Sequence, residues 1–153
     1  METESFKILP MQKEDSLQVR ELLQQLGYIV SIEELMLRFD QVASDSRNCA
    51  LLVAKTQQGA VVGWIELSIQ THLCSGLSAQ ICGLVVSDKQ RGRGVGSALL
   101  ESAEVWAHKR SALEIWLRTN IKRKDAHRFY ERAGYKNTKT SLKYVKCFSD
   151  ENK

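Results

Sequence analysis

A short run of glycines and arginines, Gln90–Ser97, has the residue types and spacing of an anion-binding loop. It follows an apolar run, Ile81–Val86, that is typical of a buried strand, and it precedes an amphipathic helix pattern. Glycines let a ligand approach the backbone closely, the N-terminus of a helix carries unpaired N–H donors, and arginines add positive charge. The sequence therefore predicts that this loop holds a phosphorylated cofactor.

Two familiar phosphate-binding motifs do not match the loop. The chain lacks a Walker A run, and a dinucleotide fingerprint counted from Gly92 would need its third glycine where Ser97 stands. What remains is R-x-x-G-x-G, formed by Arg91, Gly94 and Gly96. Alone, this pattern also fits a glycine-rich turn with solvated arginines, but the strand before it and the helix after it favour a binding loop. In that setting the motif resembles the acyl-CoA loop of the GNAT acetyltransferase superfamily.

A second motif strengthens the resemblance. Asn120 and the segment Ala126–Tyr135 are similar to the GNAT pattern N-x-x-A-x-x-F-Y-x-x-x-G-F/Y, although Ile121–Asp125 make the spacing longer here. The resemblance covers most of the chain and is strongest over residues 61–144.

Composition bounds the class of protein. The 153 residues are 43% hydrophobic and 26% charged, which is ordinary for one globular domain. No apolar run approaches the length of a membrane span, and the acidic N-terminus does not resemble a signal peptide, so we expect a cytoplasmic protein that does not bind membranes. The four cysteines show no C-x-x-C pairing and no metal-ligand spacing, which predicts reduced thiols and no metal site.

The net charge of +4 suits a polyanionic cofactor and does not demand nucleic acid. An RNA-binding module could use the basic runs Arg91–Gly94 and Lys122–Lys124, but neither is interleaved with the aromatic residues that stack on bases. We therefore expect no nucleic-acid partner.

Periodicity and turn residues predict one strand, two helices, three strands, a helix, a strand, a helix and one or two final strands. The expected strands are Phe6–Leu9, Cys49–Thr56, Ala60–Thr71, Ser78–Ser87, Ala112–Thr119, one opening at Tyr135, and Ser141–Phe148. The expected helices begin at Asp15 or Ser16 and end at Gly27, run from Ser31 to Ala43 and from Gly94 to Arg110, and run from Asp125 to Ala133.

This order matches the GNAT fold. The resemblance implies a single α/β (mixed α+β) domain over residues 1–153, with a frayed tail at 148–153. It also implies a mostly antiparallel twisted sheet of six to seven strands flanked by about four helices. Two strands of that sheet splay apart, and the pantetheine arm of acetyl-CoA lies in the gap.

The resemblance assigns most of the cofactor contacts to backbone groups. The strand residues would pair with pantetheine amides and polarise the thioester carbonyl, and the loop would bind the pyrophosphate. The residues expected to contact acetyl-CoA are Leu84, Val85, Val86, Arg91, Gly92, Arg93, Gly94, Val95, Gly96, Ser97, Asn120, His127 and Tyr130.

Acetyl transfer to an amine poses two proton problems. An amine with a pKa of about 10.4 is a free nucleophile in roughly one molecule in a few thousand at neutral pH, so a base or a water chain must take a proton. The departing CoA thiolate must then gain one, and a tyrosine hydroxyl can donate it. The resemblance gives this role to Tyr130. The alternative interpretation is that Tyr130 is an aromatic core residue on an amphipathic helix.

The base is less evident from the sequence. Many GNAT relatives carry a carboxylate near the positions held here by Gln80 and Cys82, and neither residue is such a base. Glu66 lies in a central strand pattern and is the candidate base, acting directly or through water; a solvated position on an open sheet face is the alternative. Asn120 fits a strand-end turn equally well, and His127 also fits a surface position on its helix.

Together these features predict an N-acetyltransferase in which a primary amine attacks acetyl-CoA directly in a ternary complex. A small-molecule acceptor is favoured over a protein. A protein or peptide N-acetyltransferase and a non-catalytic acyl-CoA sensor are the alternatives. The resemblance also leads us to consider a homodimer.

Overall fold

The computed structural model describes residues 5–149, in which the chain forms two compact units that we describe separately. The first unit ends at Arg118 and the second begins at Thr119. The expected frayed tail lies mostly outside the described residues. The single-domain organisation stays a prediction.

The first unit contains five strands and three α-helices among its described residues. The strands are β1 (Phe6–Pro10), β2 (Cys49–Thr56), β3 (Val61–His72), β4 (Gly76–Val86) and β5 (Ile115–Leu117). The helices are α1 (Ser16–Gln25), α2 (Ile32–Ala43) and α3 (Val95–Lys109), with short 3₁₀ turns at η1 (Lys13–Asp15) and η2 (Asp88–Gln90).

These strands form one sheet in the order β1-β2-β3-β4-β5. β1 to β4 pair antiparallel, whereas β5 runs parallel to β4. The mixed, mostly antiparallel sheet and the α/β class confirm the expectation from the sequence. The strand count of six to seven is wrong, because the described residues hold five.

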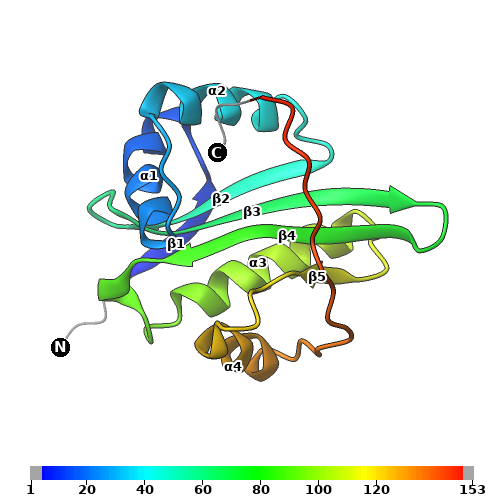
Figure 1. Ribbon diagram of the computed structural model, residues 1–153. Coiled ribbons are helices and arrows are strands. Elements are labelled where there is room, and N and C mark those ends of the chain that lie inside the picture. The colour runs from blue at the N-terminus through cyan, green and yellow to red at the C-terminus, as the bar shows by residue number, and fades with distance from the viewer. Residues whose placement is uncertain (1–4, 150–153) are drawn as a thin grey trace. The chain divides into compact units, whose positions relative to one another are not determined.

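Helices cover both faces of this sheet, with α1 and α2 on one side and α3 on the other (Figure 1). Successive strand residues face opposite sides. Trp64 packs with Val19 and Leu22 of α1, and a Cβ on the neighbouring Gly63 would lie 2.9 Å from Val95 and Leu99 of α3. Adjacent residues of β3 therefore contribute to two cores, one beneath α1 and one beneath α3.

Local sequence signals set most helix ends. The Ser31 side chain accepts a hydrogen bond from the backbone N–H of Glu34, as a capping residue should. Gly27, after α1, has a φ of 88°, a left-handed conformation that suits glycine at a helix end. Asp15 precedes α1 but does not cap it: its carboxylate accepts from Gln12 N and pairs with Lys55 Nζ at 2.6 Å.

From the sequence, one face of α3 is expected to carry Val95, Ala98, Leu99, Ser102, Val105 and Trp106, and this expectation is partly wrong. Val95 and Leu99 are buried as expected, but Val105 is 54% exposed. The other buried residues of this helix are Leu100, Ala103 and Ala107, so the buried stripe follows every fourth residue from Val95 to Ala107.

The second unit contains one helix, α4 (Lys124–Arg132), followed by irregular chain up to residue 149. Gly134 ends the helix with a φ of 91°. Asp125 lies inside the first turn and pairs with Arg128, so it is not the cap.

The strands expected at Tyr135 and at Ser141–Phe148 are wrong, because neither segment forms a strand in the described chain. Leu142, Tyr144 and Phe148 are largely exposed. Alternation of apolar residues indicates a face that can be buried, but a strand also needs a hydrogen-bonded neighbour. Among residues 5–149, no helix is long and apolar enough to cross a membrane.

Candidate active site

The loop between β4 and α3 has the geometry of an anion site. Gly92 and Gly94 take φ values of 75° and 83°, and a Cβ built on either would meet no atom within 4 Å. Glycine is therefore required here by the backbone conformation, and the space beside both residues is open. The Ala98 N–H donates to the Gly94 carbonyl at 3.0 Å as the first bond of the helix. The N–H groups of Val95, Gly96 and Ser97 precede that bond and are the orphan donors of a helix N-terminus.

The two loop arginines contact their neighbours in the structure. Arg91 pairs with Asp88 at 2.6 Å, with both side chains about 60% exposed, and Arg93 Nη1 donates to Gln90 Oε1 at 3.4 Å. Exposed pairs of this kind contribute little to stability, so exchanging them for a phosphate oxygen costs little.

β4 has an open edge just before this loop. β5 pairs with β4 only at Ala79, Gln80 and Ile81, and no other described strand pairs with β4 on that side. The segment Cys82–Val86 therefore offers backbone groups to an extended ligand, which is how a peptide-like arm adds to a sheet.

An irregularity in β4 coincides with the point where β5 stops. Glu66 of β3 lies opposite Gly83 and Leu67 lies opposite Ile81, so Cys82 is an extra residue, as in a β-bulge. A bulge bends a strand, and this one begins where the pairing of β4 with β5 ends. The apolar run in the sequence did not reveal this bulge.

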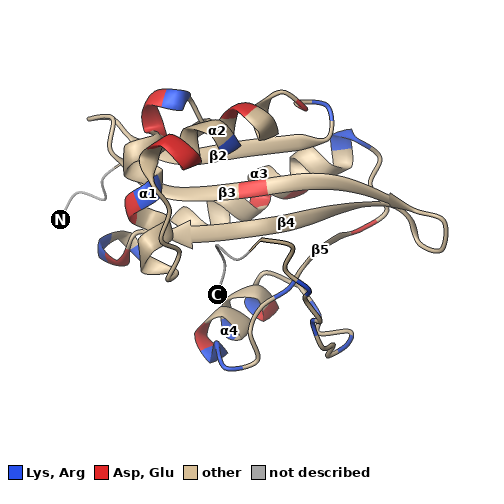
Figure 2. Cartoon of the chain, turned by 45° about the horizontal axis from the view of Figure 1, so that its top comes forward, with Lys and Arg blue, Asp and Glu red and all other residues tan. Residues whose placement is uncertain are grey.

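Glu66 lies mid-strand and shares the sheet face of Trp64, which α1 covers. It is the only Asp or Glu of β3, the strand that carries a red band in Figure 2. Burial raises the pKa of its carboxyl above the ordinary value. The carboxylate has no hydrogen bond or ion pair with any described residue. A half-buried carboxylate with a raised pKa is a stronger base than an exposed one.

A row of polar side chains continues from Glu66 along the same sheet face. Ser68 Oγ lies 3.4 Å from Cys82 Sγ, and Gln70 pairs through its amide with Gln80. The spacing of Glu66, Ser68 and Gln70 by two residues was the signal in the sequence that would have found this row. Burial and the nearby Glu66 raise the pKa of the Cys82 thiol, so this thiol stays protonated.

Tyr130 lies on α4 in the second unit. Its ring is edge-on to those of Phe129 and Tyr135, with centroids 5.1 and 5.9 Å away. Burial raises the pKa of the phenol, while the charge of Arg123 opposes that shift in part. The hydroxyl is therefore protonated at neutral pH, which is the state that an acid catalyst needs.

Asn120 and His127 hold the turn that precedes α4. Asn120 Oδ1 accepts the Lys122 backbone N–H at 2.9 Å, and His127 Nε2 donates to the Asn120 carbonyl at 2.9 Å. Through these bonds both residues stabilise the turn before α4. Their predicted contact with the cofactor stays a prediction.

Leu84–Val86 and residues 91–97 lie in the first unit, at the end of β4 and in the loop and first turn that follow it, and their contact with the cofactor stays a prediction. Glu66 lies opposite Gly83, beside the open edge. Asn120, His127 and Tyr130 belong to the second unit. All four cysteines are free thiols. No group of three metal-ligating side chains occurs within the described part of the chain.

Comparison with known proteins agrees with this geometry. Residues 16–135 match the family model described as the acetyltransferase (GNAT) family. The chain is 48% identical over 81 residues to an aminoalkylphosphonate N-acetyltransferase of Salmonella typhimurium (strain LT2), covering 52% of this chain and 53% of that protein. It is 33% identical over 106 residues to an aminoglycoside N(6′)-acetyltransferase type 1 of Klebsiella aerogenes, covering 67% of each. The chain thus spans about half the length of the first relative and two thirds of the second.

A solved structure described as a transcriptional regulator from Bacillus halodurans C-125 shares the fold. Its TM-score is 0.83 at 26% identity, covering 92% of this chain and 99% of the other. The family match spans most of the described residues and includes the loop, β4 and α4. The chain therefore belongs to the acetyltransferase (GNAT) family.

Proposed function

We propose that this chain transfers the acetyl group of acetyl-CoA to the primary amine of a small molecule. One observation carries the proposal: the open edge at Cys82–Val86 leads directly into a loop with two left-handed glycines and a free helix N-terminus. An extended amide-bearing arm fits the edge, and a pyrophosphate fits the loop. Leu84, Val85 and Val86 bind the arm, and Arg91, Gly92, Arg93, Gly94, Val95, Gly96 and Ser97 bind the phosphates.

The chemistry follows from two titratable groups. Glu66 takes a proton from the ammonium group of the acceptor, directly or through water, and the amine nitrogen then attacks the thioester carbonyl carbon. The carbon–sulfur bond breaks, Tyr130 donates its proton to the CoA thiolate, and the amide nitrogen returns its surplus proton to the Tyr130 phenolate, directly or through water. Support comes from burial, which raises the pKa of each group: it makes the Glu66 carboxylate a stronger base and keeps Tyr130 in the protonated form that can donate. Asn120 and His127 are proposed to contact acetyl-CoA by motif position.

The acceptor is proposed to be a small amine that arrives as an ammonium ion. Two relatives are named for small amines, an aminoalkylphosphonate and an aminoglycoside. The carboxylate of Glu66, without an ion-pair partner among the described residues, attracts such a cation. The neutral side chains of Ser68, Gln70 and Gln80 suit hydrogen bonds to its polar groups.

An acetylation screen tests this proposal. Purified protein is incubated with acetyl-CoA and, separately, an aminoalkylphosphonate, an aminoglycoside, a polyamine and a lysine-containing peptide. Loss of thioester absorbance is the readout, because the four free cysteines would react with a thiol reagent. We expect turnover with at least one small amine.

Two results would contradict the proposal in different ways. Turnover with the peptide alone would show that the acceptor class is wrong. Binding of acetyl-CoA by calorimetry without turnover of any amine would favour an acyl-CoA sensor over an enzyme.

A further inference from the structure

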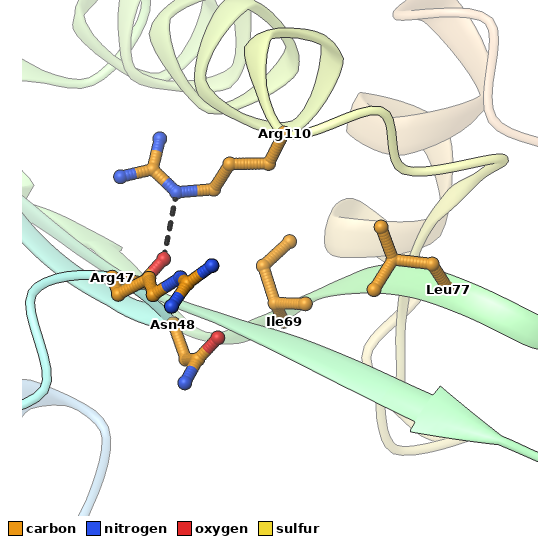
Figure 3. A pocket seen from close by; sticks show the side chains of 5 residues that line it. All are labelled: Arg47, Asn48, Ile69, Leu77 and Arg110. Atoms are coloured by element: carbon orange, nitrogen blue, oxygen red, sulfur yellow. Dashed lines mark hydrogen bonds between the residues drawn. The ribbon is translucent and has the colours of Figure 1, made fainter.

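A pocket of about 500 Å³ lies in the first unit, away from the residues assigned to acetyl transfer. Its lining combines two guanidinium groups, one amide and two aliphatic side chains, from Arg47, Asn48, Ile69, Leu77 and Arg110 (Figure 3). Its volume is in the range of sites that hold small molecules.

The pocket is on the opposite face of the sheet from Glu66. Ile69 alternates with Glu66 and Ser68 along β3, so it shares the side of Ile65 and Leu67, which α3 covers. Arg110 follows the C-terminal end of α3, whose 15 residues span roughly 22 Å from the anion loop. The pocket is therefore separate from the proposed acetyl-CoA site.

Arg110 is held in place before any ligand arrives. Its Nε donates to the Arg47 carbonyl at 3.0 Å, its Nη2 to the Ser46 carbonyl at 3.3 Å and its Nη1 to the Trp106 carbonyl at 3.4 Å. The guanidinium carbon also lies 4.2 Å from the centre of the Trp106 ring. Three of the five N–H donors are used, and the other two have no partner in the described chain.

The charge of Arg47 has no partner at all among the described side chains. The carboxylate of Asp45, the acidic residue of this loop, accepts from the side-chain amide of Asn48, with distances of 3.1 and 3.2 Å to its two oxygens. The Arg47 side chain makes no hydrogen bond or ion pair with any described residue. Two cations thus line one pocket, one fixed by backbone carbonyls and one free to close on a ligand.

We propose that this pocket binds a small organic anion whose carboxylate contacts Arg47 and Arg110 and whose branched aliphatic part packs on Ile69 and Leu77. A planar guanidinium matches a carboxylate with two parallel hydrogen bonds, and its rigidity lowers the entropy cost of binding. The half-buried aliphatic side chains favour binding of such a ligand over an inorganic anion, because an inorganic anion has no apolar surface to bury against them.

Three probes test the proposal by amide chemical shifts of the ¹⁵N-labelled full chain. They are 3-methylbutanoate, 3-methylbutanol and inorganic phosphate. We expect saturable shifts at Asn48, Ile69 and Leu77 with the carboxylate, and at least about tenfold weaker binding of the alcohol and of phosphate. Equal affinity for phosphate would overturn the apolar part of the proposal, and absence of saturable shifts with all three would overturn the site.

Variants then separate contact from long-range charge. Arg47→Gln should weaken 3-methylbutanoate about tenfold, whereas Lys109→Gln removes an equal charge from the neighbouring helix end and should change affinity less than twofold. Leu77→Ala should weaken the carboxylate but leave phosphate unchanged. Equal losses in Arg47→Gln and Lys109→Gln would contradict direct contact. The readout is binding alone, so it does not depend on the proposed acetyl transfer.

Discussion

At the scale of single residues, the phenol of Tyr130 carries the proposed acid step. Removing its hydroxyl keeps the ring that packs on Phe129 and Tyr135. We expect Tyr130→Phe to lower kcat by about 10²-fold, with little change in the KM for acetyl-CoA, because a positioned acid acts mainly in the transition state. Steady-state kinetics at several pH values measures both.

The pH profile adds a second check on Tyr130. Its raised pKa keeps the acid protonated beyond the ordinary range of tyrosine, so the alkaline fall in kcat should come late and should vanish in Tyr130→Phe. Tyr144→Phe, an exposed tyrosine, is the control and should behave as the parent does. Full kcat in Tyr130→Phe would mean that another group or water protonates the thiolate.

Glu66 is expected both to serve as the catalytic base and to lower the stability of the folded protein. A base works when deprotonated, so the raised pKa of Glu66 moves the acidic fall in kcat to higher pH, and Glu66→Gln should remove that fall together with most of kcat. A carboxyl whose folded pKa is raised contributes stability below its unfolded pKa and loses it as pH rises through the folded one. Glu66→Gln should therefore melt slightly higher than the parent at neutral pH. Unchanged kcat would assign the base role to water alone.

At the scale of elements, the anion loop depends on backbone conformation more than on side chains. Gly94 has a φ of 83° and Gly59, in the β2–β3 hairpin, has a φ of 84°, and neither has an atom near a built Cβ. Alanine at either position should cost about 1–2 kcal/mol of stability, because left-handed backbone is strained for residues with a side chain.

Affinity for CoA separates these two matched variants. Gly94→Ala should weaken CoA at least about tenfold by calorimetry, since it distorts the N-terminal turn that presents the orphan N–H groups. Gly59→Ala should bind CoA as the parent does. Equal affinities in the two variants would remove the loop from the cofactor site.

The bulged part of β4 depends on an aromatic contact across the sheet. A Cβ on Gly83 would lie 2.7 Å from Cζ3 of Trp64, a distance that no packed pair tolerates. Gly83→Ala should destabilise the fold by about 1–3 kcal/mol in urea unfolding. Trp64→Phe removes the clashing atoms, so the double variant should lose less than the two single losses added together. Strict additivity would show that the ring is not the obstacle.

At the scale of the whole molecule, ligand binding should be visible as stability. Acetyl-CoA at about 100 times its Kd adds about 2.7 kcal/mol to a protein that binds it only when folded, which raises Tm by roughly 5–10 °C for a chain of this size. The acetyl thioester of N-acetylcysteamine lacks the phosphates and should give almost no shift at the same concentration. Equal shifts would mean that the anion loop contributes nothing.

The sequence predicted the order of elements through α4, because long periodic segments and residues such as Ser31, Gly59 and Gly134 mark their own limits. It also predicted which residues form the loop, because the glycines there are required by the left-handed backbone conformation. It did not predict the fate of Ser141–Phe148 or the bulge at Cys82. Both depend on which strand lies alongside. Local periodicity does not specify the pairing between segments that are distant in the sequence.

The bulge has a consequence for which side of the sheet each β4 residue serves. Ile81 and Val85 are four positions apart, so an unbroken strand would turn them to the same face. Instead Ile81 pairs with Leu67, on the α3 side, while Val85 pairs with Trp64, in the core beneath α1. Cys82 therefore shifts the alternation between the two sheet faces by one residue within the strand. Deleting this single residue should leave every later residue on its present face, because Ile81 and Val85 would then be three positions apart in a regular strand, and should remove only the bulge.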